Sequence, residues 1–147
     1  MERSVYIVKP DAFECEFYMR RMFECEDLRI VDSRAVRVSV DVLEHLYPDV
    51  FAEKGELWEA TVHHFAERSS MVVVVQGQTA IRLVREISGE NTNPNSCARL
   101  TVRYIFGTHT PIVLPGGRFY WRNAIHRPEN EDEAKAHLLL IHRFFGL

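Results

Sequence analysis

The chain has 147 residues, of which 46% are hydrophobic and 27% are charged, and its formal net charge is −3 with seven histidines counted as neutral. These values are typical of one soluble globular domain with a single core. They exclude a broad basic surface for nucleic acid and a polybasic patch for a membrane. No segment approaches the ~20 apolar residues of a membrane span, and no signal-peptide pattern is present.

The cysteines of the chain are Cys15, Cys25 and Cys97, an odd number with no Cys-x-x-Cys pair and no zinc-binding spacing. We therefore expect buried or half-buried free thiols in a reducing compartment. This expectation, with the absence of a targeting pattern, favours a cytoplasmic protein with no membrane or nucleic-acid partner.

The first half of the chain alternates between short β-prone runs and helical patterns. Pro10 ends the first strand, and Asp11 followed by Glu14 matches a capping box that opens a helix. A loop containing Pro48 and Gly55 is expected to separate two later helices. The predicted elements are strands at 4–9 and 29–38, a helix from 11 onwards, and helices at 40–47 and 57–65.

The second half begins with an apolar run at residues 71–75, which predicts a central strand buried on both faces. Thr79 can cap the following helix, and Gly89 ends it. The later predictions are a polar loop at 90–96, a short helix at 97–106, an excursion at 107–118, an edge strand or turn at 123–126, and a helix at 132–145.

The order of these elements is roughly β-α-β-α-α-β-α-loop-β-α. With two helices on one side of a small antiparallel sheet, this order predicts an α+β sandwich of ferredoxin-like type, a four-stranded antiparallel sheet covered by helices. No repeat, low-complexity segment or linker interrupts it, so we expect one domain over residues 1–147.

Phosphate binding, if the chain has it, must use side chains, because neither a P-loop nor a Gly-x-Gly-x-x-Gly fingerprint is present. Each candidate also has an ordinary structural interpretation. Lys9 could be a solvated strand end and Arg103 an exposed helix residue. Arg85 could pair with Glu86 or Glu90, and His126 could be a core or surface histidine. The candidates are Lys9, Arg85, Thr92, Arg103, Asn123 and His126.

Four motifs in the right order give these residues a common context. The stretches are Lys9-Pro10-Asp11-Ala12, Arg85 to Gly89 followed by Thr92-Asn93-Pro94, Thr101-Val102-Arg103, and Arg122-Asn123-Ala124-Ile125-His126. They resemble the Lys-Pro-Asp-Ala, Arg-x-x-x-Gly with Thr-Asn-Pro, Thr-Ile-Arg and Arg-Asn-x-Ile-His motifs of nucleoside diphosphate kinases. The resemblance covers nearly the whole chain.

The resemblance implies transfer of the γ-phosphate of ATP to a nucleoside diphosphate through a phosphohistidine on the pros nitrogen of His126, with ping-pong kinetics. Lys9, Arg85, Thr92, Arg103 and Asn123 would bind the nucleotide, and Lys9 and Asn123 would also assist catalysis. Mg²⁺ would be held mainly by the phosphates, without a protein metal site. Family members are homo-oligomers, most often hexamers.

The base-stacking residue is less clear from the sequence. Leu57 aligns best with the family's stacking position, and Trp58 and Tyr47 lie nearby in the chain. A core position for Trp58 on its helix is an equally good interpretation.

The sequence departs from the family around the proposed nucleophile. The family's Gly-Ser-Asp after the histidine is replaced by Arg127-Pro128-Glu129, and Arg127 either assists phosphate binding or is a solvated residue. The family glutamate that holds the second imidazole nitrogen aligns with His137. Because Glu133 lies one helical turn earlier, we take Glu133 as the hypothetical orienter of His126.

A further departure is an insertion at about 107–121. The apolar residues 112–114 followed by Pro115-Gly116-Gly117 could form a hairpin. The insertion could rim the base site, remodel an oligomer interface, or be a tolerated surface loop, although its aromatic triplet at 119–121 favours packing.

Two other classes of function compete with the enzyme. The changes after His126 and at His137 are compatible with a catalytically weakened member that serves as a nucleotide-binding or protein-interaction module. Nucleic-acid binding by a ferredoxin-like sheet would need a basic face and exposed aromatic motifs that the sequence lacks.

Overall fold

The computed structural model describes residues 1–24 and 27–147, so the prediction for Cys25 lies outside the described residues. The strands are Glu2–Val8 (β1), Arg29–Arg37 (β2), Ser69–Gly77 (β3), Ile112–Val113 (β4), Phe119–Tyr120 (β5) and Ile125–His126 (β6). The α-helices are Glu16–Glu24 (α1), Val40–Leu46 (α2), Pro48–Glu53 (α3), Glu56–Phe65 (α4), Ala80–Ser88 (α5), Val102–Phe106 (α6) and Glu131–Phe145 (α7), with 3-10 turns at Pro10–Cys15 (η1) and Pro94–Ser96 (η2).

The main sheet has the strand order β2-β3-β1-β6, with every pair antiparallel. The strand formed by the valine run, β3, is central as predicted, and β6 is a short edge strand that pairs Ile7 with His126. This pairing carries His126 to the end of β1 that leads into Lys9. The predicted α+β fold with a four-stranded antiparallel sheet is confirmed.

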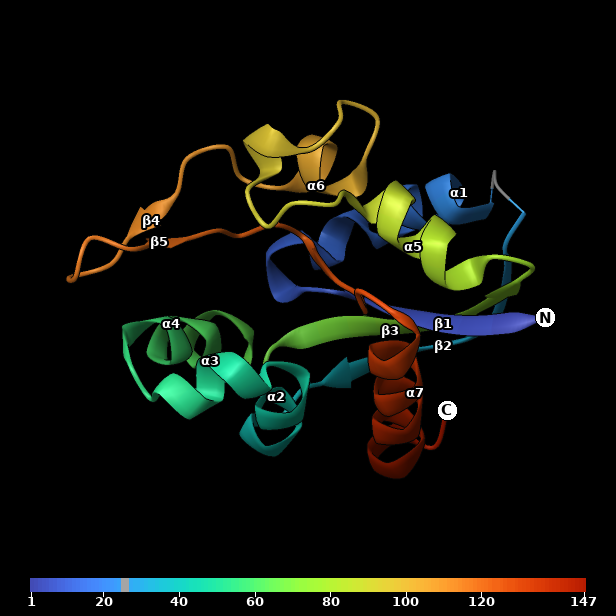
Figure 1. Cartoon of the computed structure of the whole chain (residues 1–147), viewed down its shortest axis with the longest axis horizontal. Helices are drawn as coiled ribbons and strands as arrows, with labels where there is room; N and C mark the ends of the chain where they lie inside the picture. Colours follow the sequence, from blue (N-terminus) through green and yellow to red (C-terminus); the bar gives the residue numbers. More distant parts are fainter. Residues whose placement is uncertain (25–26) are drawn as a thin grey trace.

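Helices cover both faces of this sheet, whereas the sequence led us to expect two helices on one side. Figure 1 shows α1, α5 and α6 on one face and α2, α4 and α7 on the other. Each face of the sheet has its own hydrophobic core, and alternate residues of β1 contribute to the two. Tyr6 and Val8 pack with α1 and α5, while Val5 and Ile7 pack with α2 and α7. The central strands are therefore apolar on both sides.

Two local predictions need correction. The loop with Pro48 contains helix α3, because proline at the first helical position starts a helix as readily as it ends one. Asp11 does not cap a helix: the chain turns there through η1, and the Asp11 carboxylate accepts a hydrogen bond from the Ala124 amide at 3.0 Å. Asp11 thus fastens the start of the chain to the segment that precedes His126.

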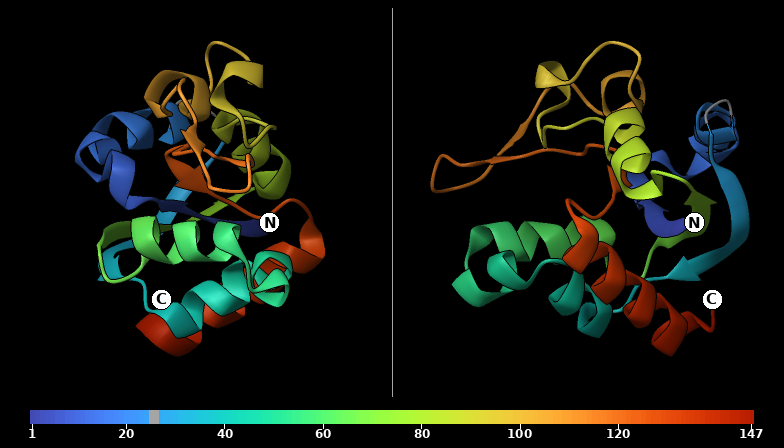
Figure 2. Two further views of the ribbon diagram at one scale, coloured as in Figure 1. Left: turned by 90° about the vertical axis from the view of Figure 1, so that its left-hand side faces the viewer. Right: turned by 45° about the vertical axis from the view of Figure 1, so that its right-hand side comes forward.

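The predicted hairpin is present in the 107–121 stretch. Strands β4 and β5 pair antiparallel and project from the body (Figures 1 and 2). The base of the hairpin packs on α4, where Leu114 and Tyr120 contact Ala60. Farther out, the Gly116 amide donates to Glu56 at 2.7 Å. Packing, as the aromatic triplet suggested, describes this hairpin better than a free surface loop.

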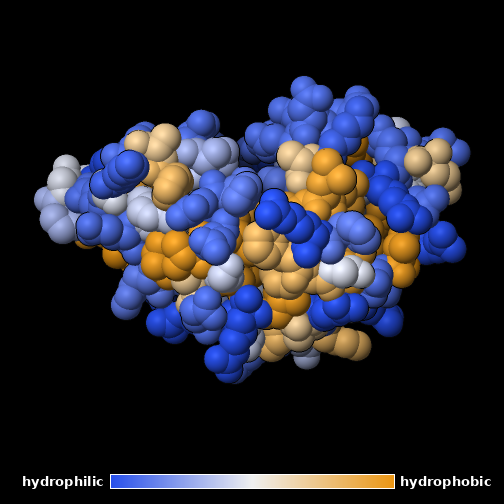
Figure 3. Space-filling view, turned by 90° about the horizontal axis from the view of Figure 1, so that it is seen from below, coloured by the Kyte–Doolittle hydropathy of each residue, from blue (hydrophilic) through white to orange (hydrophobic). Residues whose placement is uncertain are grey.

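The cysteines that the structure describes are free thiols, with Cys15 half-buried and Cys97 buried. In the described part of the chain, no helix is both long and apolar enough to cross a bilayer. The face of the molecule seen in Figure 3 is largely hydrophilic, with apolar side chains in separate patches.

Candidate active site

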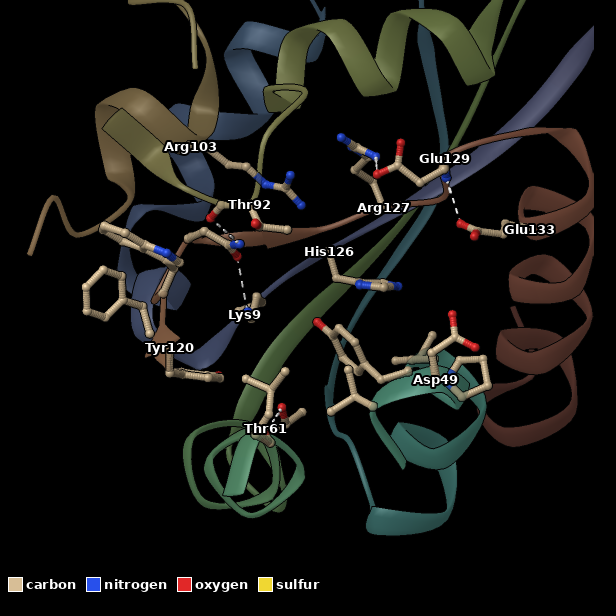
Figure 4. A pocket seen from close by; sticks show the side chains of 18 residues that line it. Lys9, Asp49, Thr61, Thr92, Arg103, Tyr120, His126, Arg127, Glu129 and Glu133 are labelled. Carbon is tan, nitrogen blue, oxygen red and sulfur yellow. Dashed lines mark hydrogen bonds and ion pairs between the residues drawn. The ribbon is translucent and has the colours of Figure 1, made fainter. Parts of the chain in front are cut away.

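A cavity of about 370 Å³ opens where β1 and β6 end, between helices α2–α4 and the β4–β5 hairpin. Five of the six candidate phosphate-binding residues from the sequence line it (Figure 4). These are Lys9, Thr92, Arg103, Asn123 and His126. The other lining residues that matter below are Tyr47, Asp49, Leu57, Thr61, Phe119, Tyr120, Trp121, Arg127, Glu129 and Glu133.

Lys9 is a buried cation at the floor of this cavity, only 5% exposed. Its Nζ donates to Oδ1 of Asn123 at 3.1 Å, and Nδ2 of Asn123 donates to the Thr92 carbonyl at 3.0 Å. Burial, partly opposed by Asp11 and reinforced by Arg103, lowers the pKa of Lys9 from 10.5 to about 8. Three of the four sequence motifs therefore meet through one chain of hydrogen bonds.

Ala124 links this floor to the nucleophile candidate and adopts a left-handed backbone with φ of 73°. Such a conformation costs a non-glycine residue about 1–2 kcal/mol. Its amide is held by Asp11 and its carbonyl accepts from the Lys9 amide at 2.9 Å. The Lys-Pro-Asp stretch thereby offsets the strain and sets the direction of the strand that ends at His126.

Arg103 holds three backbone segments together from the buried side of the cavity. Its Nη1 donates to the carbonyls of Gly89 at 3.2 Å and Asn91 at 3.0 Å, and its Nη2 donates to that of Ile125 at 3.2 Å. Burial, reinforced by the nearby Arg127, lowers its pKa to about 10, so it stays protonated at neutral pH. A side chain at Gly89 would collide with this arrangement, since a Cβ there would lie 2.9 Å from Sγ of Cys97.

His126 lies between these cations and helix α7, and its ring extends toward α7 in Figure 4. Nε2 is enclosed and has no hydrogen-bond partner, whereas Nδ1 is not enclosed in this way. Burial, with His137 and Lys9 as further causes, lowers the pKa of His126 well below its ordinary value. The imidazole is therefore neutral at pH 7, with Nδ1 as its accessible nitrogen.

The group beside the enclosed face of His126 is another histidine. The rings of His126 and His137 have centroids 5.0 Å apart, and Nδ1 of His137 is also enclosed without a partner. Burial lowers the pKa of His137, so this ring is neutral as well. The His126 ring also packs against Tyr47, with centroids 4.7 Å apart.

Glu133 is not where the sequence hypothesis placed it. Its Oε2 accepts from the Glu129 amide at 2.8 Å, while its own amide donates to Oδ1 of Asn130 at 2.9 Å. These bonds close the first turn of α7, which begins at Glu131. They hold the Glu133 carboxylate against the backbone at Glu129 and not against the ring of His126. Glu133 lines the mouth of the cavity but makes no hydrogen bond to His126.

Replacing Glu133 with alanine should therefore affect the helix more than the chemistry. We expect a loss of about 0.5–2 kcal/mol of stability, as for other lost N-terminal caps, and a phosphotransfer rate within about threefold of wild type. Thermal unfolding and a steady-state assay of the same preparation measure the two quantities. A rate loss much larger than the stability loss would restore the orienting role to Glu133.

Arg85 is the one predicted phosphate ligand that the structure does not bring to the cavity. Its Nη2 pairs with Glu90 at 3.3 Å and its Nη1 reaches the Glu129 carbonyl at 3.4 Å. The ordinary alternative of an ion pair with Glu90 is thus observed. Arg127, in contrast, lines the cavity and is only 3% exposed, so its interpretation as a solvated residue is wrong.

The outer part of the cavity is apolar and aromatic. Leu57 lines it as expected, and Tyr47 lies deeper, against His126. Trp58 does not line it: its ring packs edge-on against Phe51, with centroids 5.0 Å apart, in agreement with the core interpretation. Phe119, Tyr120 and Trp121 line it too, as the expectation that the insertion could rim this site allowed.

The donor set of the cavity suits a metal ion carried by a ligand. Asp49, Glu129 and Glu133 bring carboxylates to the mouth, but no group of three potential ligand side chains gathers anywhere in residues 1–24 and 27–147. Mg²⁺ typically uses one or two carboxylates plus the phosphates of a substrate. These residues would suit a cation held mainly by the phosphates of a bound ligand.

Sequence comparison places this arrangement in a known family. The family model described as nucleoside diphosphate kinase matches residues 2–145. The chain belongs to the nucleoside diphosphate kinase family. Such enzymes are phosphotransferases that act on nucleotides, which accounts for a cation-lined cavity around an accessible imidazole.

Individual nucleoside diphosphate kinases resemble this chain along almost its full length. The enzyme of Halorhodospira halophila is 36% identical over 137 residues, covering 92% of this chain and 88% of the relative. That of Methanococcus maripaludis is 29% identical over 149 residues, covering 99% of each. The crystal structure of the Aquifex aeolicus nucleoside diphosphate kinase superposes with a TM-score of 0.76 at 26% identity, covering 95% of this chain and 94% of that one.

Proposed function

We propose that this family member is an active nucleoside diphosphate kinase that transfers the γ-phosphate of ATP to a nucleoside diphosphate through a phosphohistidine at Nδ1 of His126. The observation that carries the proposal is the state of this ring: it is neutral, only Nε2 is enclosed, and the ring faces a cavity lined by Lys9 and Arg103. A neutral imidazole with one accessible lone pair is a good nucleophile at pH 7.

The chemistry balances without an additional base. The lone pair of Nδ1 forms the N–P bond as the bond from the γ-phosphorus to the bridging oxygen breaks, and ADP leaves with that electron pair. A terminal oxygen of the acceptor diphosphate then attacks the same phosphorus, and the N–P bond returns its electrons to Nδ1. His126 ends in its starting state, so the two half-reactions are the same step run in opposite directions.

The surrounding residues supply positioning and charge, which phosphoryl transfer needs most. In the proposal, Lys9 and Arg103 bind phosphate oxygens, the Thr92 hydroxyl donates to another, and Asn123 bridges a sugar hydroxyl and a phosphate. Mg²⁺ held by the phosphates, within reach of the carboxylates at the mouth, would supply further neutralisation of charge. Arg85 enters this scheme only if nucleotide binding releases it from Glu90.

The apolar outer part of the cavity determines which nucleotide bases we expect the protein to accept. Leu57 and the hairpin aromatics Phe119 and Trp121 offer the base an apolar surface and few hydrogen-bonding groups. A coupled assay with ATP as donor and ADP-free preparations of GDP, CDP and UDP as acceptors should give comparable rates, because stacking discriminates little between bases. Activity with a single base only would contradict this part of the proposal.

The alternative function, a weakened member acting as a binding module, rests on the pair of histidines. With no carboxylate bonded to Nε2, the positive charge that develops on the imidazole during attack is stabilised less than it would be by an anion. His137 lies beside this ring but makes no hydrogen bond to Nε2, so it does not replace the missing carboxylate. Nucleotide binding without any phosphoenzyme would favour the alternative.

The pKa of Lys9 gives a pH dependence that tests its role. Below pH 8 the lysine is protonated before and after binding, whereas above pH 8 a bound polyphosphate must first restore its proton. The affinity for ADP should therefore fall as pH rises from about 8 to 9, by at most about tenfold per unit. Calorimetric titration measures this slope. A Lys9→Arg variant, charged throughout, should flatten it, and an equal slope in both proteins would remove Lys9 from phosphate binding.

We also propose a homo-oligomer, a hexamer as the family resemblance implies, and a cytoplasmic location consistent with the free thiols. Several large apolar side chains remain exposed on one chain, a surface suited to subunit contacts. They include Phe17, Tyr18, Val31, Leu100 and Leu139. Light scattering coupled to size-exclusion chromatography measures the subunit number directly.

A further inference from the structure

Arg127, the residue directly after His126, is a buried guanidinium with one backbone hydrogen bond and one ion pair to a carboxylate at the rim. Its Nη2 donates to the Gly89 carbonyl at 2.8 Å, but Nε and Nη1 are enclosed and make no hydrogen bond. Nη1 lies 2.5 Å from Oε1 of Glu129, although the two groups are not aligned for a hydrogen bond. Buried charged groups normally have such partners, so this guanidinium is arranged for a further acceptor.

The surroundings of Arg127 are strongly positive. Arg103 and Arg127 donate to the same Gly89 carbonyl, and their proximity contributes to the lowered pKa of Arg103. Lys9 lies across the cavity from them and also acts on His126. The acidic partner of Arg127 is Glu129, whose side chain is 55% exposed, so this compensation sits at the rim and can move into solvent.

Arg85 does not line the cavity, although the sequence predicted that it would bind phosphate. The sequence assigned the second phosphate-binding guanidinium to Arg85, but its ion pair with Glu90 holds it away from the cavity lining. Arg127 lines the same cavity from a different segment. The two arginines are also linked, because Arg85 contacts the carbonyl of Glu129, the residue whose carboxylate pairs with Arg127.

We propose that Arg127 binds the terminal phosphate of the nucleotide together with Arg103, and that the phosphate displaces the Glu129 carboxylate from Arg127. This inference rests on the proposed function, since it assigns a residue to the polyphosphate of the same cavity. A guanidinium presents paired donors that match two oxygens of one phosphate, which a lone lysine does not. Glu129 then acts as an internal competitor that occupies the site until an anion arrives.

The test is calorimetric titration of the full chain with ADP and with AMP, which lacks the terminal phosphate. Arg127→Met should weaken ADP binding by about 10- to 100-fold, the loss expected for a charge-assisted hydrogen-bonding pair, and AMP binding by much less. Glu129→Gln removes the competitor and should tighten ADP binding severalfold. The matched control is Glu86→Gln, which removes an exposed carboxylate paired with Arg82 away from the cavity lining and should leave ADP affinity unchanged.

The outcomes separate this inference from the proposed function. If wild type does not bind ADP, both fail, whereas if wild type binds and Arg127→Met binds equally well, only the role of Arg127 is overturned. If Arg127→Met does not fold, judged by thermal unfolding, Glu129→Gln decides: a structural strut predicts unchanged or weaker ADP binding in that variant, and that result would overturn the proposal.

Discussion

Replacing His126 with alanine should reduce phosphotransfer by at least about 10⁴-fold, because it removes the atom to which the phosphoryl group is transferred. The ring makes no hydrogen bond in the structure, so the protein should lose little stability. Nucleotide affinity should stay within a few-fold of wild type, since removing a neutral imidazole takes no charge from the phosphates. Steady-state rates with ATP and GDP, together with ADP titration, measure both effects.

The matched control for this variant is His142→Ala. His142 is an exposed histidine near the end of α7, where Nδ1 contacts the Leu147 carbonyl at 3.2 Å. It does not line the cavity, so its loss should leave the rate unchanged. Substantial activity in His126→Ala at unchanged protein purity would place the nucleophile elsewhere and leave the proposed mechanism without its central residue.

The second large effect is expected at Arg103. Arg103→Met should lower kcat/KM by about 10²- to 10³-fold, the loss typical of removing one charge-stabilising donor from an active site. It also removes the guanidinium donor from the carbonyls of Asn91 and Ile125, whereas the Gly89 carbonyl keeps Arg127 as a donor, and each unsatisfied buried group costs about 1–3 kcal/mol. The melting temperature should therefore fall together with the rate.

Arg103→Lys separates these two contributions. Lysine keeps the positive charge but cannot reach the carbonyls of Gly89, Asn91 and Ile125 in the same planar geometry. It should recover part of the rate and little of the stability. If Arg103→Met were destabilised but reacted at the wild-type rate below its melting temperature, Arg103 would be a structural strut without a catalytic part.

The fold could be predicted from the sequence wherever local chemistry dominates. The valine run at 71–75 is apolar on both faces, and such a strand has to be central in a sheet covered on both sides. The hairpin followed from a Pro-Gly-Gly turn beside an apolar triplet. Pro48 was misjudged because proline has the same appearance whether it ends one helix or begins the next.

The site was predictable in part, for a different reason. Lys9, Thr92, Arg103, Asn123 and His126 meet at one cavity because the motifs that contain them are joined by hydrogen bonds across the chain. The orientations of three other side chains depend on partners a few residues away along the chain. Arg85 pairs with Glu90, Arg127 pairs with the Glu129 carboxylate, and Glu133 accepts from the Glu129 amide. Spacing along a sequence does not rank such partners, so these side chains needed coordinates.

The most direct measurement is a single half-reaction: the protein is mixed with ATP labelled at the γ-phosphate, quenched in base, and the modified residue is mapped. We expect a stoichiometric, acid-labile and base-stable label on His126 that disappears on addition of any nucleoside diphosphate. Lys9 and Arg103 line the same cavity as that ring, where their charges would stabilise a phosphoryl group transferred to it. Tight nucleotide binding with no labelled histidine, or a label that persists in His126→Ala, would contradict it.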